Sequence, residues 1–431
     1  MNNLIEPRVL KGFRDFLPPA EITRRDIIEK LESSFRTYGF VPIDTPALEY
    51  SEILLGKGGG ETEKQIYRFK DHGERDVALR FDLTVPLARY LAEHYHELSF
   101  PFKRYHIAKV WRGENTQKGR YREFTQCDFD IIGTSSVSSD FEILHMMHRT
   151  LQDVSGGAVT IHINHRGLFN RFLSRLNLLE KSEDILRTVD KLAKIGEDET
   201  LSLLSQLSGE DNAKKILAYI KPRETFEDTL KAITLASGPC SEAENLSLIR
   251  KYTVDSGIAG SIVLNPSITR GLDYYTGIVF ESFLSDLPKI GSICSGGRYD
   301  NLVGLYSKEK MPGVGTSIGI DRLIAGLETL EKLKTRQSYA NTAIAWVSES
   351  SGGACQALAE KFREKGIPCE VFLEEEKLSK QFQRAEKKNI LWFVIPDAEN
   401  PITRALTLRN LATRENREGL DMAEILKTIK K

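Results

Sequence analysis

The amino-acid sequence predicts a chain of mixed α and β structure in two or three domains, and three observations indicate this fold class. Residues 104–133 contain a period-2 alternation that predicts two paired strands. A Leu-, Lys- and Glu-rich stretch at about 180–250 has helical periodicity, which predicts an inserted helical module. Beyond about residue 342, strands and helices alternate, which predicts a small α/β domain with a mainly parallel or mixed sheet. A length of 431 residues is sufficient for these cores.

The composition limits the compartment and the partners. With 60 basic and 61 acidic residues the net charge is −1, so a nucleic-acid partner would have to bind local basic patches. No pair of cysteines forms a C-x-x-C motif, which argues against a structural zinc site, and an odd number suits a reducing compartment. Neither a signal-peptide core at the N-terminus nor a membrane-spanning apolar run is present in the sequence, so we expect a cytoplasmic protein without a membrane partner. The five cysteines are Cys127, Cys240, Cys294, Cys355 and Cys369.

The N-terminal region predicts a helix followed by a proline-interrupted extended segment. Residues 11–20 form a loop with two prolines, and apolar residues then recur at helical spacing over about 20–37. Pro46 limits strand pairing on one side of the extended segment that follows. This region is either scaffold or a subunit interface.

A strand-to-helix junction at 77–95 places two small polar side chains together. VALRF (77–81) predicts a strand, and VPLARYLAEHY (85–95) predicts a helix with Pro86 in its first turn. Asp82 and Thr84 lie between them, where such residues usually cap a helix. A carboxylate and a hydroxyl at a strand end can also hold an ammonium group, and the two roles are compatible.

The hairpin at 104–133 has an unusually polar second strand. In EFTQCDFDII (123–132), Gln126, Asp128 and Asp130 fall on one face, whereas the apolar residues between them fall on the other. Burying three polar groups costs free energy unless something binds them. An amphipathic edge hairpin with a solvated polar face is the alternative interpretation. The flanking cations, expected at the mouth of the hairpin, are Arg112, Arg120 and Arg122.

Strand character returns after the helical module. Residues 261–284 contain Arg270 and the pair Tyr274–Tyr275. The paired glycines of SICSGGRYDNLVGLY (292–306) indicate close approach by a ligand or by backbone. Residues 312–330 predict a strand entering a helix with Arg322 in its first turn, where a cation opposes the helix dipole unless an anion or an acidic neighbour accompanies it.

Two further groups of basic side chains have ordinary explanations as well as functional ones. His145 and His148 are three residues apart, but no third ligand is placed to complete a metal site, so we interpret them as packing or surface histidines. In the C-terminal domain, one face of a predicted helix is basic, which suits either solvation or a phosphate backbone. That face comprises Lys377, Lys380, Arg384, Lys387 and Lys388.

Several stretches, taken together, resemble the signature motifs of histidyl-tRNA synthetases, which are class II aminoacyl-tRNA synthetases. WRGENTQKGRYREFTQCDFDIIG (111–133) resembles the second class II motif in its histidyl form, and GVGTSIGIDRL (313–323) is similar to the third. TRGLDYYTGIVFE (269–281) and SGGRYDNLVG (295–304) resemble the two signatures peculiar to the histidyl enzymes. KGFRDFLPPAE (11–21) and the segment up to Glu49 resemble the family's N-terminus and dimer-forming first motif.

The resemblance implies a fold and an activity. The fold would be an α+β class II catalytic domain, an antiparallel sheet flanked by helices, at 1–330, with a helical insertion at 180–250. A linker at 331–341 and a Rossmann-like α/β anticodon-binding domain at 342–431 would follow. The activity would be that of a histidine–tRNA ligase, which forms histidyl-adenylate from histidine and ATP with Mg²⁺ and transfers histidine to tRNA(His). A homodimer without a structural metal is implied.

The resemblance also assigns roles to side chains. Histidine would be bound by Asp82, Leu83, Thr84, Gln126, Asp130, Tyr274 and Tyr275, with Asp130 and Tyr275 contacting the imidazole nitrogens. ATP would be bound by Arg112, Glu114, Arg120, Arg270 and Arg322, of which Arg112, Arg270 and Arg322 would be catalytic. tRNA would be bound by Gln117, Lys118, Lys380, Arg384 and Lys387.

Elementary chemistry agrees with these roles. Attack of a carboxylate on a phosphorus of ATP brings two anions together, so fixed cations must offset the repulsion, and no general base is needed. Hydrogen bonding to imidazole rejects analogues that lack its polar atoms by about 10⁴–10⁵, so no editing domain is expected.

Two alternatives share the fold. The regulatory subunit of ATP phosphoribosyltransferase usually lacks the anticodon domain and parts of the arginine-containing signature, which this sequence retains. Class II synthetases for glycine, threonine or proline would not need Asp130 and Tyr274–Tyr275 for a diazole ring.

Overall fold

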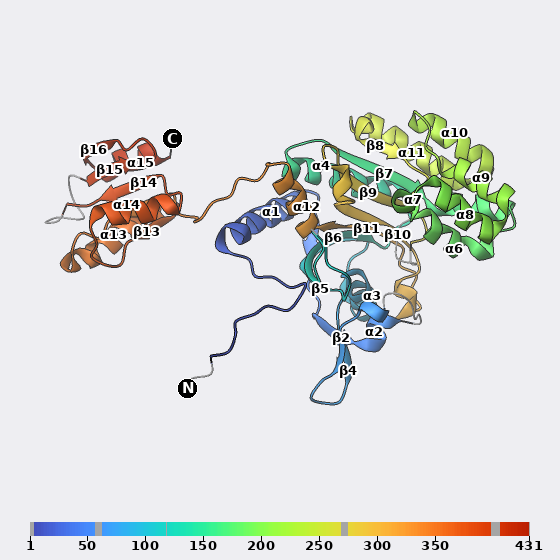
Figure 1. Ribbon diagram of the computed structural model, residues 1–431, viewed down its shortest axis with the longest axis horizontal. Helices are drawn as coiled ribbons and strands as arrows, with labels where there is room; N and C mark the ends of the chain where they lie inside the picture. Colours follow the sequence, from blue (N-terminus) through green and yellow to red (C-terminus); the bar gives the residue numbers. More distant parts are fainter. Residues whose placement is uncertain (1–3, 57–62, 118, 269–274, 398–405, 431) are drawn as a thin grey trace. The chain divides into compact units, whose positions relative to one another are not determined.

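An eight-stranded mixed sheet forms the centre of the larger of two compact units (Figure 1). The computed structural model describes residues 4–56, 63–117, 119–268, 275–397 and 406–430. The strand order is β1-β5-β6-β11-β10-β9-β7-β8; the pairs from β5 to β7 are antiparallel, and the edge pairs β1–β5 and β7–β8 are parallel. The antiparallel core that the resemblance implied is therefore confirmed. The strands are β1 (Val41–Pro42), β5 (Phe102–Trp111), β6 (Glu123–Ile132), β7 (Val159–His165), β8 (Ile262–Leu264), β9 (Ile278–Leu284), β10 (Cys294–Tyr299) and β11 (Gly313–Gly319).

The two faces of this sheet have different coverings. Helix α4 (Val137–Ser155) packs across β6, β7, β9, β10 and β11, and Phe129 lies on this face against Phe35 with ring centroids 4.9 Å apart. Because strand side chains alternate, Asp128 and Asp130 are directed to the opposite face. Both carboxylates are nevertheless buried, within the lining of a cavity, and β6 is an interior strand of the sheet, not an edge strand. The alternative of a solvated edge hairpin is therefore wrong.

Shorter elements surround the sheet. Helix α3 packs its apolar side chains against the ends of β6 and β10 and against the segment that precedes β11. A second, three-stranded sheet has the order β2-β4-β3. These elements are α1 (Pro18–Thr37), α2 (Ser51–Leu55), α3 (Thr84–Glu93), α5 (Arg166–Arg175), α12 (Ile320–Thr329), β2 (Leu48–Tyr50), β3 (Arg68–Lys70) and β4 (Asp76–Leu79).

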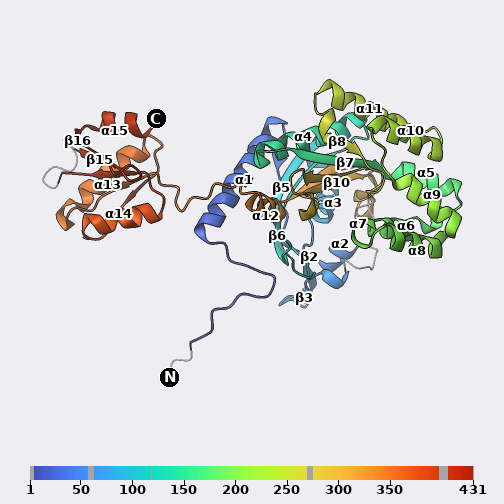
Figure 2. The same cartoon turned by 45° about the horizontal axis from the view of Figure 1, so that its top comes forward.

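The predicted helical module is present beside the β7–β8 end of the sheet (Figures 1 and 2). Helix α5 joins it to the sheet, since Phe172 of α5 stacks on Tyr219 of α9 with ring centroids 4.3 Å apart. Helices α10 and α11 continue this packing onto α5, and α11 also packs on α4. The helices of the module are α6 (Ser182–Val189), α7 (Leu192–Ile195), α8 (Glu197–Ser208), α9 (Glu210–Ile220), α10 (Phe226–Ser237) and α11 (Ser241–Asp255).

The second unit has the predicted α/β alternation. Its sheet has the order β13-β12-β14-β15-β16, in which β12 pairs parallel with β13 and β14, while β15 and β16 pair antiparallel. The mixed sheet follows from the last two strands, which form a hairpin instead of a further βαβ crossover. The elements are β12 (Thr342–Ile344), α13 (Gly352–Arg363), β13 (Cys369–Val371), α14 (Leu378–Lys387), β14 (Trp392–Ile395), β15 (Leu406–Asn410), β16 (Asn416–Leu420) and α15 (Met422–Ile429).

The units consist of residues 1–14 with 28–332, and of residues 15–27 with 333–431, so that α1 contributes to both. The division at 330 and 342 stays a prediction. Within the described ranges, no helix is long and apolar enough to cross a membrane.

The paired glycines of β10 allow backbone to approach closely. A Cβ at Gly296 would overlap the carbonyl oxygen of Gly315 and the backbone of Thr316 on β11. A Cβ at Gly315 would in turn overlap the carboxylate of Asp130. The sequence left ligand or backbone open as the reason for these glycines, and at Gly296 the reason is backbone.

Gly296→Ala should therefore lower the free energy of unfolding by about 2–3 kcal/mol, because the neighbouring strand cannot move aside without breaking its pairing. Urea unfolding measures this loss. Gly304→Ala is the matched control, since nothing lies within 4 Å of its Cβ position. Equal stability of the two variants would contradict the explanation.

Candidate functional site

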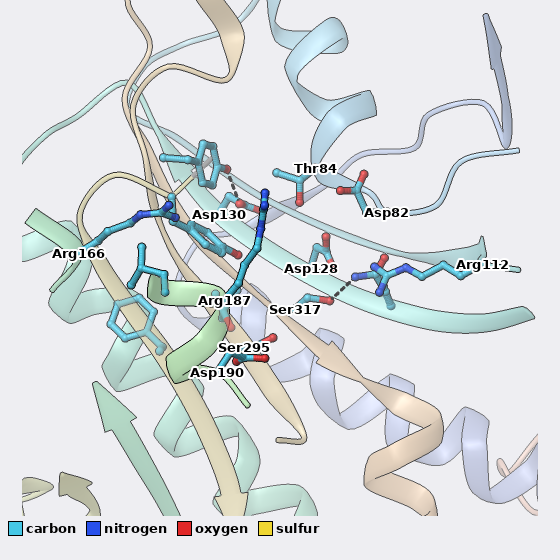
Figure 3. A pocket seen from close by; sticks show the side chains of 18 of the residues that line it. Asp82, Thr84, Arg112, Asp128, Asp130, Arg166, Arg187, Asp190, Ser295 and Ser317 are labelled. Atoms are coloured by element: carbon cyan, nitrogen blue, oxygen red, sulfur yellow. Dashed lines mark hydrogen bonds between the residues drawn. The ribbon is translucent and has the colours of Figure 1, made fainter. Parts of the chain in front are cut away.

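Two adjoining cavities lie over the polar face of β6, β10 and β11, and Figure 3 shows side chains that line one of them, the larger. The larger, of about 690 Å³, contains the carboxylates, and the smaller, of about 200 Å³, contains arginines around a strand-to-helix junction. Arg112, Arg120, Gln126, Ser295 and Ser317 line both. A ligand in one cavity can therefore contact a ligand in the other.

Asp82 both caps α3 and lines the larger cavity. Its Oδ1 accepts a hydrogen bond from the backbone N–H of Val85 at 3.1 Å, whereas its buried Oδ2 accepts none from the described residues. Burial raises the pKa of Asp82 to about 6, against the opposing effects of the Val85 N–H and of Arg112. Thr84 lines the same cavity, but the side chain of Leu83 is fully buried and does not line it.

The β6 row forms the floor of the larger cavity. Gln126 Nε2 donates to Ser317 Oγ at 3.0 Å, and Asp128 lies beside Ser317. Asp130 forms an ion pair with Arg104 at 2.6 Å and accepts a hydrogen bond from the hydroxyl of Tyr299 at 2.5 Å. Burial raises the pKa of Asp130 and Asp128, the latter to about 7, while Arg104 opposes this effect.

The signature at 269–281 contributes two described side chains to the larger cavity, Tyr275 and Phe280. Tyr275 lines the cavity together with Tyr299 and Phe280. The predicted site residues Arg270 and Tyr274 lie outside the described residues.

The smaller cavity has the cations that the sequence predicted. Arg112 Nε donates to the carbonyl oxygen of Phe81 at 2.8 Å, which fixes the side chain across the junction of the two cavities. Arg322 Nη1 donates to the carbonyl oxygen of Ser292 at 2.7 Å, and Arg120 pairs with Glu114 at 3.4 Å. Three arginines and two acids line this cavity, and both acids are already paired with arginines, Glu114 with Arg120 and Asp321 with Arg14, so the cavity suits a polyanion.

Other predicted residues lie away from the cavities. Arg122, expected at the mouth of the hairpin, instead donates to the backbone carbonyls of Glu114 and Lys11 at 3.3 and 3.4 Å. Gln117 is exposed in the loop between β5 and β6, and Lys118 lies outside the described residues.

The basic face of α14 is partly neutralised within its own unit. Arg384 pairs with Glu376 at 2.9 Å, and Lys388 pairs with Glu370 at 2.5 Å. Lys380 and Lys387 are exposed. These two residues are therefore better candidates for phosphate contacts than Arg384.

The histidine pair of α4 takes part in packing. His145 hydrogen-bonds Tyr38 at 3.2 Å, and His148 hydrogen-bonds Ser261 at 3.0 Å. Among the described residues, no group of three or more potential ligands is placed to hold a metal ion.

Sequence analysis missed several side chains of the larger cavity. Arg104 holds Asp130 from the adjacent strand β5, and Tyr299 holds it from β10, on the far side of β11. Both contacts depend on strand register, which no local pattern reveals. Helices α5 and α6 and the segment to α7 contribute charged side chains from the module, which had no catalytic pattern of its own. These are Arg166, Glu183, Arg187, Asp190, Lys191 and Lys194.

This arrangement defines a class of site: a cavity with buried carboxylates for an ammonium-bearing molecule, joined to an arginine-lined cavity for a phosphorylated one, on an antiparallel sheet. That is the site of a class II aminoacyl-tRNA synthetase. Comparisons with known proteins then give the particular family. A histidyl-tRNA synthetase family model matches residues 12–323, and an anticodon-binding domain model matches residues 342–431. The chain belongs to the histidyl-tRNA synthetase family.

Individual relatives agree. The chain is 56% identical to a histidine–tRNA ligase of Treponema denticola over 93% of this chain and 91% of the relative. It is similar to the crystal structure of histidyl-tRNA synthetase from Nostoc, with a TM-score of 0.87, 32% identity and 99% of both chains covered. A structure from Bacillus halodurans, described as an ATP phosphoribosyltransferase regulatory subunit/histidyl-tRNA synthetase, is 20% identical with a TM-score of 0.75 and covers 92% of this chain and all of that one, and this likeness concerns the fold alone.

Mutation can separate the helix-capping role of Asp82 from the effect of its buried charge. Asp82→Asn keeps an acceptor for the Val85 N–H and removes a buried charge, whereas Asp82→Ala removes both. Because the folded-state pKa of about 6 lies above the unfolded value, the charge destabilises the protein increasingly as the pH rises from about 4 through 6.

Urea unfolding should therefore show Asp82→Asn at least as stable as the native protein near pH 7, with the advantage shrinking as the pH falls toward about 5. Asp82→Ala should be about 1 kcal/mol less stable than Asp82→Asn at either pH, because it lacks the cap. An alanine variant as stable as the asparagine variant would rule out the capping role.

Proposed function

We propose that the chain is a histidine–tRNA ligase, which activates histidine with ATP to histidyl-adenylate and transfers the histidyl group to the 3′ end of tRNA(His). The observation that carries the proposal is the junction of the two cavities at Arg112. A carboxylate-lined cavity beside an arginine-lined one brings an amino acid next to a nucleotide. The regulatory-subunit alternative is not favoured, since the curated relatives at high identity and coverage are histidine–tRNA ligases.

The larger cavity would bind histidine. Asp82, Thr84 and Gln126 would hold the α-ammonium group at one end, where Asp82 lines the cavity and its Oδ2 has no hydrogen-bond partner among the described residues. Asp130 and Tyr275 would contact the imidazole nitrogens at the other end. Asp130 suits this role because Arg104 and Tyr299 fix its carboxylate. Leu83, whose side chain is in the core, would act through its backbone, and Tyr274 would complete the wall.

The smaller cavity would bind ATP. Arg112, at the junction, would contact the α-phosphate, and Arg322 would contact the triphosphate and the adenine side. Arg120 and Glu114, which already pair with one another, would complete the nucleotide site. Mg²⁺ would enter with ATP, because that ion is commonly held by substrate phosphates together with only one or two carboxylates.

Activation requires charge stabilisation and no proton transfer. A carboxylate oxygen of histidine attacks the α-phosphorus, a new P–O bond forms, and the bond to the pyrophosphate leaving group breaks. Arg112 and Arg270 would stabilise the negative charge on the α-phosphate in the transition state. Arg112 is positioned for this by its hydrogen bond to the Phe81 carbonyl.

Transfer would use parts of the chain away from the adenylate. The loop with Gln117 and Lys118 would meet the acceptor end, and Lys380, Arg384 and Lys387 of α14 would contact the tRNA backbone in an anticodon-binding domain at 342–431. A homodimer in the cytoplasm, formed through the first motif, completes the proposal.

The activity has a direct test. Purified protein with Mg²⁺ should exchange labelled pyrophosphate into ATP only when histidine is present. Arg112→Ala should reduce the exchange kcat by about 10²–10³ by removing charge stabilisation, with a smaller change in histidine affinity. Lys109→Ala, an exposed residue of β5 paired with Glu123, is the control and should exchange normally. Absence of histidine-dependent exchange in the native protein would refute the ligase.

The tRNA contacts can be tested separately. Lys380→Glu combined with Lys387→Glu should weaken tRNA binding and reduce the slope of log affinity against log salt by about 2, while pyrophosphate exchange stays unchanged. Lys361→Glu combined with Lys365→Glu, exposed at the end of α13 and just after it, is the matched control. Aminoacylation equal to that of the native protein would show that the α14 face is merely solvated.

A further inference from the structure

Three buried acceptor atoms at one end of the larger cavity have no hydrogen-bond donor among the described residues. They are Asp82 Oδ2, Gln126 Oε1 and Asp128 Oδ1. An ammonium group has three N–H donors. We propose that Asp128 is the third hydrogen-bond acceptor for the α-ammonium group of the amino acid, completing a tripod with Asp82 and Gln126, while Thr84 lines the wall beside Asp82. This inference rests on the proposed function and deepens it, because Asp128 has no role in the activity as described above.

The hydrogen bonds around Ser317 orient two of the three acceptors. The Ser317 hydroxyl lies beside the carboxylate of Asp128, whose pKa it lowers, and it accepts a hydrogen bond from Gln126 Nε2 at 3.0 Å. The amide nitrogen of Gln126 is thereby used, so its Oε1 is the atom left for a ligand. Asp128 likewise has one oxygen beside Ser317 and one without a partner.

Strand geometry separates Asp128 from Asp130. Residues two apart on a strand share a face and have Cα atoms about 7 Å apart. Asp128 therefore lies between the ammonium end of the cavity, at Gln126, and the imidazole end, at Asp130. Asp130 is already held by Arg104 and Tyr299, whereas Figure 3 shows the carboxylate of Asp128 facing the space below Asp82 and Thr84.

The buried charges support a cationic ligand at this point. Three carboxylates, Asp82, Asp128 and Asp130, are each at most 3% exposed. Two buried guanidinium groups, Arg104 and Arg80, lie beside them, and Arg112 approaches Asp82 from the nucleotide side. His106, opposite Asp128 on β5, contributes no charge at neutral pH, because burial and the two arginines lower its pKa to about 4. With Arg112 serving the nucleotide, the two buried arginines leave one of the three carboxylates without a counter-charge, which one ammonium group would supply.

Without a ligand, the carboxyl groups of Asp82 and Asp128 have pKa values above the ordinary value for aspartate. Burial raises the pKa of Asp128 to about 7 and that of Asp82 to about 6. The charge of Asp82 raises the pKa of Asp128 further, and Arg104 opposes both shifts. An ammonium group favours the ionised carboxylates and thus lowers both pKa values. Ligand binding should therefore release protons near neutral pH.

The test compares Asp128→Asn with the native protein. Asp128→Asn should raise the KM for histidine in pyrophosphate exchange by about 10- to 100-fold, the usual effect of losing a hydrogen bond to a charged group, while the KM for ATP stays unchanged. Its Tm without ligand should be equal or higher, because an uncompensated buried charge has been removed. Asp255→Asn, exposed at the end of α11, is the matched control and should change neither quantity.

Calorimetry gives a second measurement that needs no catalysis. Histidinol keeps the ammonium group and the imidazole and lacks the carboxylate. Its binding, measured near pH 7 in two buffers of different ionisation enthalpy, should release a fraction of a proton from the native protein and less from Asp128→Asn. If the variant does not fold, the native protein alone still tests the inference. Its proton release on binding histidinol should decline to zero above about pH 8, because Asp128 is then ionised both with and without the ligand.

Distinct results overturn the inference and the proposed function. An unchanged KM for histidine in Asp128→Asn, or equal rises in both KM values with a lowered Tm, would show that Asp128 is only structural. Absence of proton release from the native protein on binding histidinol would also overturn the tripod. Absence of histidine-dependent pyrophosphate exchange in the native protein would instead refute the proposed ligase activity.

Discussion

The ion pair between Arg104 and Asp130 is the interaction on which the rest of the site depends. Arg104 is completely buried, and a buried guanidinium group without a counter-charge would cost several kcal/mol. Asp130 supplies that charge from the paired position on the next strand, and the hydroxyl of Tyr299 occupies its second oxygen. Gly315 makes room for the carboxylate on the other side. The floor of the cavity is therefore fixed before any ligand binds.

The side chains on the two sides of this floor differ in charge. Toward α3, carboxylates outnumber the buried cations, and burial raises their pKa values. Toward α12, Arg112, Arg120 and Arg322 surround a smaller space. In the proposed function, a zwitterionic amino acid would lie across this gradient with its ammonium group over the carboxylates and its carboxylate toward the arginines. The same gradient would bring the attacking carboxylate to the phosphate without a general base.

The helical module belongs to this site in a way its sequence did not suggest. Stacking of Phe172 on Tyr219 connects it to α5, and α5 leads directly from β7 of the sheet. Arg187 of α6 and Lys191 and Lys194 of the following segment thereby reach the edge of the larger cavity. A module with an unremarkable Leu/Lys/Glu pattern thus contributes charge to the cavity of a separate sheet.

The sequence by itself determined the elements and the composition of the site. Alternation placed Gln126, Asp128 and Asp130 on one face, the junction of strand and helix identified Asp82, and motif resemblance identified the fold and family, because these signals are local in the chain. Tertiary structure decided what these residues contact. Whether β6 was an edge or an interior strand depended on strand order, and the partners of Asp130 depended on the register of β6 with β5 and β11 and of β11 with β10. Both are set by long-range packing, which no local periodicity records.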